Sequence, residues 1–259
     1  RARDRPNPPK NITSTDPLNP KGLTLASKGV LRNFARNMDG NTERNTPLTV
    51  ERIFAYFPEL ATGTAAGQLR ALEGLYTAWN SQINVISRKD IQNLYERHVM
   101  HSLALAKFIP FVPGAKILDL GTGGGFPGLP LAIYYPDVEF LLIDGRKKKL
   151  KVVDEVAAAI GLTNIRTKHV RAEECQHKAD FVVSRAVAPV SQLLQWSRPL
   201  IHSTQKHGIP NGLICLKGGG QLDAEVNELG GGEYVERVNL SRFFEEAFFR
   251  EKEIVYVQG

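Results

Sequence analysis

One glycine-rich segment, Asp119 to Gly128 (DLGTGGGFPG), constrains the fold of this 259-residue chain more than any other. It directly follows an apolar run at residues 116–120, which predicts a short buried strand. Pro127 stands where a helix can begin, because its missing N–H costs nothing there. Glycines let a backbone turn tightly and let a ligand approach it closely. The segment therefore predicts a strand, a ligand-binding turn and a helix in succession.

Apolar runs and helical patterns alternate from this turn to the C-terminus. Further strands are expected at residues 138–143, 165–170, 181–183 and 213–216, with helices at 129–134, 147–160 and 190–200, and a closing antiparallel pair at 233–238 and 253–257. Strands and helices that alternate at this spacing predict an α/β fold, a doubly wound and mostly parallel sheet with helices on both faces.

The chain before the sheet divides into two regions. Residues 49–112 predict helices at about 50–57, 65–84 and 90–108, while residues 113–259 hold the strands. Residues 1–48 carry six of the 15 prolines and almost no periodic apolar pattern, so we expect a disordered basic tail there. Because the chain begins with Arg1 and not Met, we interpret the tail as a segment added for expression or a mis-set translation start. The rival interpretation is an RNA-binding arm.

Composition excludes several classes of protein. With 42% hydrophobic residues and two cysteines, the chain is not collagen-like, wholly disordered or a disulfide scaffold, and a reducing cytoplasm is expected. No apolar run is long enough to span a bilayer. The formal charge of +6 is uneven: residues 1–48 carry +5, residues 82–217 carry +7 and residues 218–259 carry −5. The basic middle of the chain favours an anionic partner.

The spacing of the glycines decides among nucleotide-binding turns. The nicotinamide fingerprint Gly-x-Gly-x-x-Gly fails, because Phe126 occupies its sixth position, and no Gly-Lys-Ser/Thr of a P-loop follows. The arrangement Asp-x-Gly-x-Gly-x-Gly is instead typical of S-adenosylmethionine (SAM) methyltransferases. Asp144 ends the next strand, where a carboxylate can accept hydrogen bonds from the ribose hydroxyls of an adenosine cofactor.

From about Leu75 onward the chain resembles the ribosomal RNA small subunit methyltransferase G family (RsmG, also called GidB). The segments that carry the resemblance are NVIS at 84–87, YERH at 95–98, GFPG at 125–128, RAE at 171–173, SRAV at 184–187 and LKG at 216–218. The resemblance implies a seven-stranded Rossmann-like methyltransferase sheet with an N-terminal helical extension. The chain departs from the family's pattern at His101, where the family usually has Asp, and at Gly145, because Ser usually follows the residue that corresponds to Asp144.

The resemblance also implies an activity and a set of contacts. Family members transfer a methyl group from SAM to N7 of the guanine at position 527 of bacterial 16S rRNA. The implied cofactor contacts are Gly121, Gly123, Phe126, Asp144, Ala172, Glu173 and Arg185. For RNA we expect contacts from Asn84, Arg97, His98, Lys147, Lys148 and Lys149. The partner is 16S rRNA or the assembling small subunit, and we expect a cytoplasmic monomer.

Methyl transfer to guanine N7 requires mainly that the protein align the base with SAM. Guanine N7 has an in-plane lone pair and no proton, so no general base is needed, and catalysis is expected from alignment and desolvation. Arg185 and Lys217 are the candidates that position the base through its O6 or a phosphate, since a donor on N7 would block attack. No metal is expected, because no third ligand motif accompanies His98 and His101.

Alternatives remain at this point. Lys147 to Lys149 could equally form a solvated helix end, although three cations there oppose the helix dipole. A methyltransferase of the same fold could act on another RNA, a protein or a small molecule. A SAM-binding or RNA-binding module without turnover is a third class.

Overall fold

The computed structural model describes residues 47–259. The expected tail, residues 1–48, lies outside them except for its last two positions. The helices are α2 (Val50–Tyr56), α3 (Gly63–Asn80), α4 (His101–Phe108), α5 (Gly128–Tyr134), α6 (Lys147–Ala159), α7 (Val190–Ser197) and α8 (Leu222–Asn227). The strands are β1 (Lys116–Leu120), β2 (Glu139–Asp144), β3 (Ile165–His169), β4 (Phe181–Arg185), β5 (Gly212–Gly218), β6 (Val235–Asn239) and β7 (Lys252–Gln258).

The seven strands form one sheet in the order β3-β2-β1-β4-β5-β7-β6. The first five run parallel, and β7 pairs antiparallel with both β5 and β6. The predicted doubly wound sheet and its closing antiparallel pair are therefore confirmed. Because β4 returns to the other side of β1, the strand order reverses beside the glycine turn, and such a reversal opens a crevice at the carboxyl ends of the strands.

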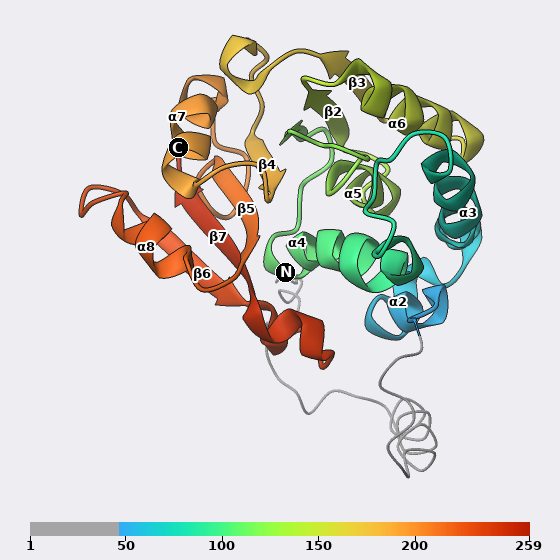
Figure 1. Ribbon diagram of the computed structural model, residues 1–259. Helices are drawn as coiled ribbons and strands as arrows, with labels where there is room; N and C mark the ends of the chain where they lie inside the picture. Colours follow the sequence, from blue (N-terminus) through green and yellow to red (C-terminus); the bar gives the residue numbers. More distant parts are fainter. Residues whose placement is uncertain (1–46) are drawn as a thin grey trace, which may run out of the picture. The chain divides into compact units, whose positions relative to one another are not determined.

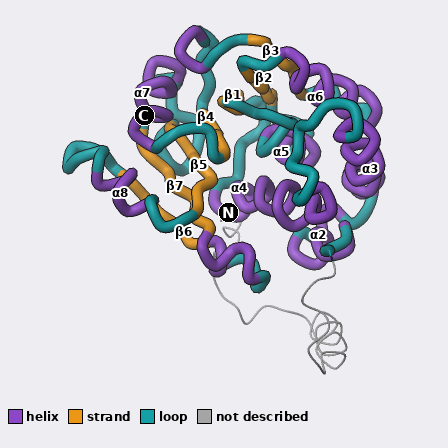
Figure 2. The backbone as a smooth tube through the Cα atoms, viewed as in Figure 1, coloured by secondary structure: helices purple, strands orange, loops and turns teal. Residues whose placement is uncertain are grey.

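Helices cover both faces of the sheet (Figure 1). On one face α5 and α6 pack on β2, α4 packs on β7 and α5, and α3 packs on α5 and α6. On the other face α7 packs on β5 and contacts α8. The tube view shows that the connection from β3 to β4 contains no α-helix, only loop and a short turn of 3₁₀ helix at Ala172–Glu174 (Figure 2).

The helical region shares its core with the sheet. One continuous cluster of buried apolar side chains includes Phe57 and Leu72 from the helices and Phe140, Phe181 and Tyr256 from the strands. Leu69, Leu72 and Tyr76 recur at helical spacing on α3, and all three are fully buried. Since Thr62 at the start of α3 makes no side-chain capping hydrogen bond, the helix depends on burial of this face for its stability.

The third expected helix, at 90–108, is not one regular α-helix. It divides into a 3₁₀ turn (Ile91–Asn93), a π-helical segment (Leu94–Met100) and α4. The Arg97 carbonyl of the π segment accepts a hydrogen bond from Arg185 of β4, and the His98 carbonyl accepts one from the Ser102 hydroxyl in the next helical turn. π segments are frequent at functional sites, and this one faces the carboxyl ends of the strands.

No helix between residues 47 and 259 is both long and apolar enough to cross a membrane.

Candidate functional site

The glycine turn leaves β1 in a conformation that requires its glycines. Gly121, Gly123 and Gly125 have φ values of +74°, +60° and +97°, which lie in the region that side chains disfavour. At Gly121 a Cβ atom would also lie 2.6 Å from Cγ2 of Val187. The turn therefore brings bare backbone against the segment that follows β4.

A buried carboxylate holds the turn from below. Asp119 is fully buried, and its Oδ2 accepts hydrogen bonds from the Thr122 hydroxyl at 2.6 Å and from the Gly128 backbone N–H at 2.8 Å. Desolvation raises the pKa of Asp119 to about 7, although both hydrogen bonds oppose the rise. Gly128 leaves room for this contact, since its Cβ would lie 2.8 Å from the same oxygen.

The helical region supports the turn from the side. The hydroxyl of Tyr76 on α3 donates to the Gly124 carbonyl at 2.6 Å, and its ring packs on Phe126 with centroids 5.1 Å apart. Val85, in the loop after α3, would contact a Cβ atom at Gly124 at 3.2 Å. Tyr76 is thus both a buried core residue and a support of the turn.

Asp144 fixes the end of β2 against the turn. Its Oδ2 accepts from the Gly123 backbone N–H at 2.9 Å, and its Oδ1 accepts from the Arg146 N–H at 2.8 Å. The two carboxylate oxygens thus lie at the carboxyl ends of β1 and β2. A carboxylate oxygen has further lone pairs for ribose hydroxyls.

A cavity of about 680 Å³, here called the first cavity, lies over this turn. The structure places every one of the sequence-predicted cofactor contacts in its lining, namely Gly121, Gly123, Phe126, Asp144, Ala172, Glu173 and Arg185. Val85, Lys149 and Val187 also line it, and of these the sequence predicted only Lys149, as an RNA contact. A cradle without Cβ atoms, a carboxylate beside it and a cation at its rim fit an adenosine cofactor with an amino-acid tail.

Arg185, at the end of β4, separates this cavity from the next. Its Nη1 donates to the Arg97 carbonyl at 3.1 Å, its Nη2 contacts Nδ1 of His98 at 3.0 Å, and its guanidinium lies 5.1 Å from the Phe126 ring centroid. Burial lowers the pKa of Arg185 to about 10, against the attraction of Asp119. The chain then turns sharply, because Ala186 has φ +52°, a strained value for a residue with a side chain. Val187 consequently stands 41% exposed between the two cavities.

The second cavity, of about 590 Å³, shares Arg185, Ala186 and Val187 with the first. Its other walls include three residues predicted from the sequence, Arg97, His98 and Lys217. Asp90, His101, Glu225, Phe248 and Lys252 also line it. The sequence did not predict these as site residues, because they come from regions that no local motif connects.

The imidazole of His98 is neutral. Burial and the charges of Arg185 and Arg97 lower its pKa to about 3. Because an arginine N–H can only donate, Nδ1 of His98 is the acceptor and its proton resides on Nε2, which has no partner among residues 47–259. His98 therefore presents no positive charge for a phosphate at neutral pH.

The remaining predicted RNA contacts do not gather with the others. Lys147 and Lys148 line a separate groove between α6 and β3, so only Lys149 of the three lysines faces the first cavity. Asn84 is exposed in the loop beside Val85 and lines neither cavity. Their contact with RNA stays a prediction.

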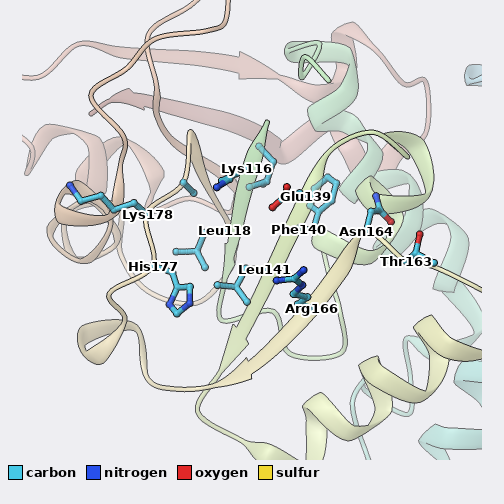
Figure 3. A pocket seen from close by; sticks show the side chains of 12 residues that line it. Lys116, Leu118, Glu139, Phe140, Leu141, Thr163, Asn164, Arg166, His177 and Lys178 are labelled. Carbon is cyan, nitrogen blue, oxygen red and sulfur yellow. The ribbon is translucent and has the colours of Figure 1, made fainter. Parts of the chain in front are cut away.

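A third cavity, of about 370 Å³, lies where the strands begin (Figure 3). Lys116 and Glu139 stand at the first positions of β1 and β2, and Asn164 directly precedes β3. Ligands of open α/β sheets bind at the opposite, carboxyl ends of the strands, so this cavity is separate from the candidate site. Within the part of the chain that the structure describes, no group of three or more His, Cys, Asp or Glu side chains is placed to hold a metal ion.

The arrangement agrees with comparisons to known proteins. Residues 66–230 match the family model for GidB, rRNA small subunit methyltransferase G. The chain belongs to this family. The ribosomal RNA small subunit methyltransferase G of Phocaeicola vulgatus is 52% identical over 208 residues, which is 80% of this chain and 98% of that protein. The same enzyme of Porphyromonas gingivalis is 50% identical, over 82% of this chain and 94% of that protein.

Family membership covers both cavities. The matched residues contain the glycine turn, Asp144, Arg185 and Lys217, whereas Phe248 and Lys252 lie beyond them. All the residues that line the first cavity, and most of those that line the second, thus lie within the segment that matches the family model.

Proposed function

We propose that this chain transfers a methyl group from SAM to N7 of a guanine in 16S rRNA. The resemblance to the family implies that this guanine is at position 527. The observation that carries the proposal is the boundary at Arg185: a cavity suited to an adenosine cofactor adjoins a second cavity, with which it shares Arg185, Ala186 and Val187. We further propose that the chain acts as a monomer in the cytoplasm, on rRNA or on a partly assembled small subunit.

The residues of the first cavity fit SAM by their chemistry. Asp144 and Glu173 supply carboxylates for hydroxyl groups, and the glycine turn supplies backbone without side chains. Arg185 and Lys149 supply positive charge for the carboxylate of the methionine tail. When bound there, SAM supplies an electrophilic methyl group on a sulfonium.

The protein's part in the reaction is to position the base and exclude water. N7 carries a free lone pair, so no group has to remove a proton, and neutral His98 is not needed as a base. The bonds of Arg185 to Arg97 and His98 hold its guanidinium at the boundary, where it orients the base without having to donate to N7. Val187 and Phe126 supply apolar surface that desolvates this boundary.

The test measures transfer from tritiated SAM to undermethylated small subunits and, separately, to free 16S rRNA. Label recovered in N7-methylguanosine supports the proposal, and the better of the two substrates identifies the natural one. Label in another nucleoside, or in protein alone, would point to a different substrate of the same fold. No label in N7-methylguanosine from either substrate would overturn the proposal.

The ribose role of Asp144 has its own test. Asp144→Ala removes charge-assisted hydrogen bonds, so SAM affinity should fall by about 1.5–3 kcal/mol, measured by calorimetry. Asp154→Ala on α6 is a matched control, because among residues 47–259 the hydrogen bond of that carboxylate is to the Thr167 hydroxyl, away from the first cavity. Unchanged SAM affinity in Asp144→Ala would contradict the role.

A further inference from the structure

The part of the second cavity's lining that the first cavity does not share contains a carboxylate held in a fixed position. Glu225 on α8 accepts two hydrogen bonds on the same oxygen, Oε2: from the Val190 backbone N–H at 3.1 Å and from Nζ of Lys217 at 2.6 Å. Its other oxygen, Oε1, makes no hydrogen bond to any residue from 47 to 259. The side chain of Glu225 is 22% exposed and lines the cavity.

Lys217 forms an ion pair with this carboxylate and a hydrogen bond within the protein. It is 8% exposed, and its ammonium group donates to the Ala188 carbonyl at 2.6 Å as well as to Glu225. Two of its three N–H groups are therefore used within the protein. The group that the second cavity offers at this wall is the acceptor Oε1 of Glu225 rather than a free lysine.

The orientation of a reacting guanine decides which of its edges meets this wall. N7 has to face the boundary with the first cavity, at Arg185 and Val187. The N1–H and 2-amino groups lie on the other ring of the purine, so they point away from that boundary. Both are donors, and enzymes that act on single bases commonly recognise the Watson–Crick edge through hydrogen bonds. Adenine offers an acceptor at N1 and no amino group at C2, so a carboxylate would repel it.

Resting on the guanine-N7 activity proposed above, we propose that Glu225 is a specificity-determining residue that accepts hydrogen bonds from N1–H and the 2-amino group of the target guanine. Lys217 and the Val190 N–H are the positioning groups that aim its free oxygen. The cavity has one other carboxylate, Asp90, which accepts from Nη1 of Arg97 at 2.6 Å. Asp90 therefore provides a matched control.

Glu225→Gln tests the carboxylate with little change in shape. The Val190 N–H and Lys217 both require an acceptor, so the amide oxygen should take the Oε2 position and leave NH₂ in place of Oε1. A donor would then face the donors of guanine. If the Glu225→Gln protein does not fold, Glu225→Asp replaces it, since this variant keeps the negative charge but has a side chain shorter by one methylene group.

The experiment compares guanine with inosine, which lacks only the 2-amino group, at the target position of 16S rRNA in reconstituted small subunits. Methyl transfer from tritiated SAM gives kcat/KM, and calorimetry gives SAM affinity. For the unmodified chain we expect inosine to be about tenfold poorer, the value of one hydrogen bond to a charged group. Glu225→Gln should lose activity on guanine about tenfold or more, and should treat guanine and inosine within about twofold. Asp90→Asn should keep the tenfold preference, and SAM affinity should be unchanged throughout.

Each other outcome overturns the inference in a distinguishable way. Equal rates on guanine and inosine by the unmodified chain would remove the role of the 2-amino group while leaving the proposed methyltransferase intact. A preference that survives Glu225→Gln, or that disappears in Asp90→Asn instead, would assign recognition elsewhere. If the unmodified chain does not methylate guanine at all, the proposed function fails and the inference with it.

Discussion

The two cavities that meet at Arg185 are built in different ways. The first is assembled mainly from the carboxyl ends of β1 to β4, and most of its residues follow strands at regular intervals along the chain. The second combines Asp90 to His101 with β4, β5, α8 and the segment before β7. Arg185 forms hydrogen bonds to Arg97 and His98, which precede it by 88 and 87 positions in the sequence.

Their electrostatics differ as well. The first cavity rests on a buried acid, Asp119, whose pKa is raised, and the second contains a buried base, His98, whose pKa is lowered. Desolvation is the leading cause in both. Burial thus favours the neutral form of both groups, whereas charged side chains also line both cavities, with Asp144 and Arg185 in the first and the Lys217–Glu225 pair in the second.

The largest expected effect is the pH dependence of stability from Asp119. Its folded pKa of about 7 exceeds the ordinary value of 3.8, so between these values the folded state binds more protons than the unfolded state. The free energy of unfolding should fall as pH rises, by about 1.4 kcal/mol per unit from this group, and level off above about pH 7. Chemical denaturation from pH 4 to 8 should show this component, and Asp119→Asn should remove it. Equal slopes in both proteins would contradict the buried acid.

His98 should give the opposite trend. Its folded pKa of about 3 lies below the ordinary 6.5, so the unfolded state binds more protons between them. Stability should therefore fall as pH drops below 6.5, again by about 1.4 kcal/mol per unit from this group. His98→Gln should remove this component from the same denaturation curve. An unchanged slope in His98→Gln would contradict the buried, neutral imidazole.

Arg185→Gln should disturb both cavities together. Loss of the guanidinium leaves the buried Arg97 carbonyl and His98 Nδ1 without their donor, so unfolding free energy should drop by about 1.5–3 kcal/mol. SAM affinity and the KM for subunits should both worsen, as measured by calorimetry and methyl transfer. Arg198→Gln, which breaks an exposed pair with Glu233, should cost at most about 1 kcal/mol and change neither. An effect on only one ligand would show that Arg185 belongs to one cavity alone.

The smallest expected effect separates two glycines. Gly121→Ala places a Cβ 2.6 Å from Val187 at a positive φ, so we expect about 1–3 kcal/mol of lost stability and weaker SAM binding. Gly74→Ala on α3, where no atom lies within 4 Å, should instead stabilise the protein by about 0.5–1 kcal/mol. Thermal unfolding with and without SAM would measure both. Equal shifts for the two variants would show that the turn tolerates a side chain.

The sheet and the first cavity could be predicted from sequence because their determinants are local. The strand at 116–120, the glycines after it and Asp144 at the end of the next strand lie within 30 residues. Parallel strands bring their carboxyl ends to one edge, so the sequence-predicted cofactor contacts converge on one cavity. The irregularity of the helix at 91–108 was not predicted, because the Arg97 carbonyl bonds to Arg185 of β4, and that partner leaves no trace in the sequence of the helix itself.

By itself the amino-acid sequence determined the order of strands and helices, the glycine turn and the family to which the chain belongs. Spacing of apolar residues and glycines is enough for this, because secondary structure and tight turns depend on near neighbours. Only the tertiary structure decided the tautomer of His98, the pairing of Lys217 with Glu225, and the boundary at Arg185. These depend on which side chains are buried beside one another, and desolvation acts only once the chain has folded.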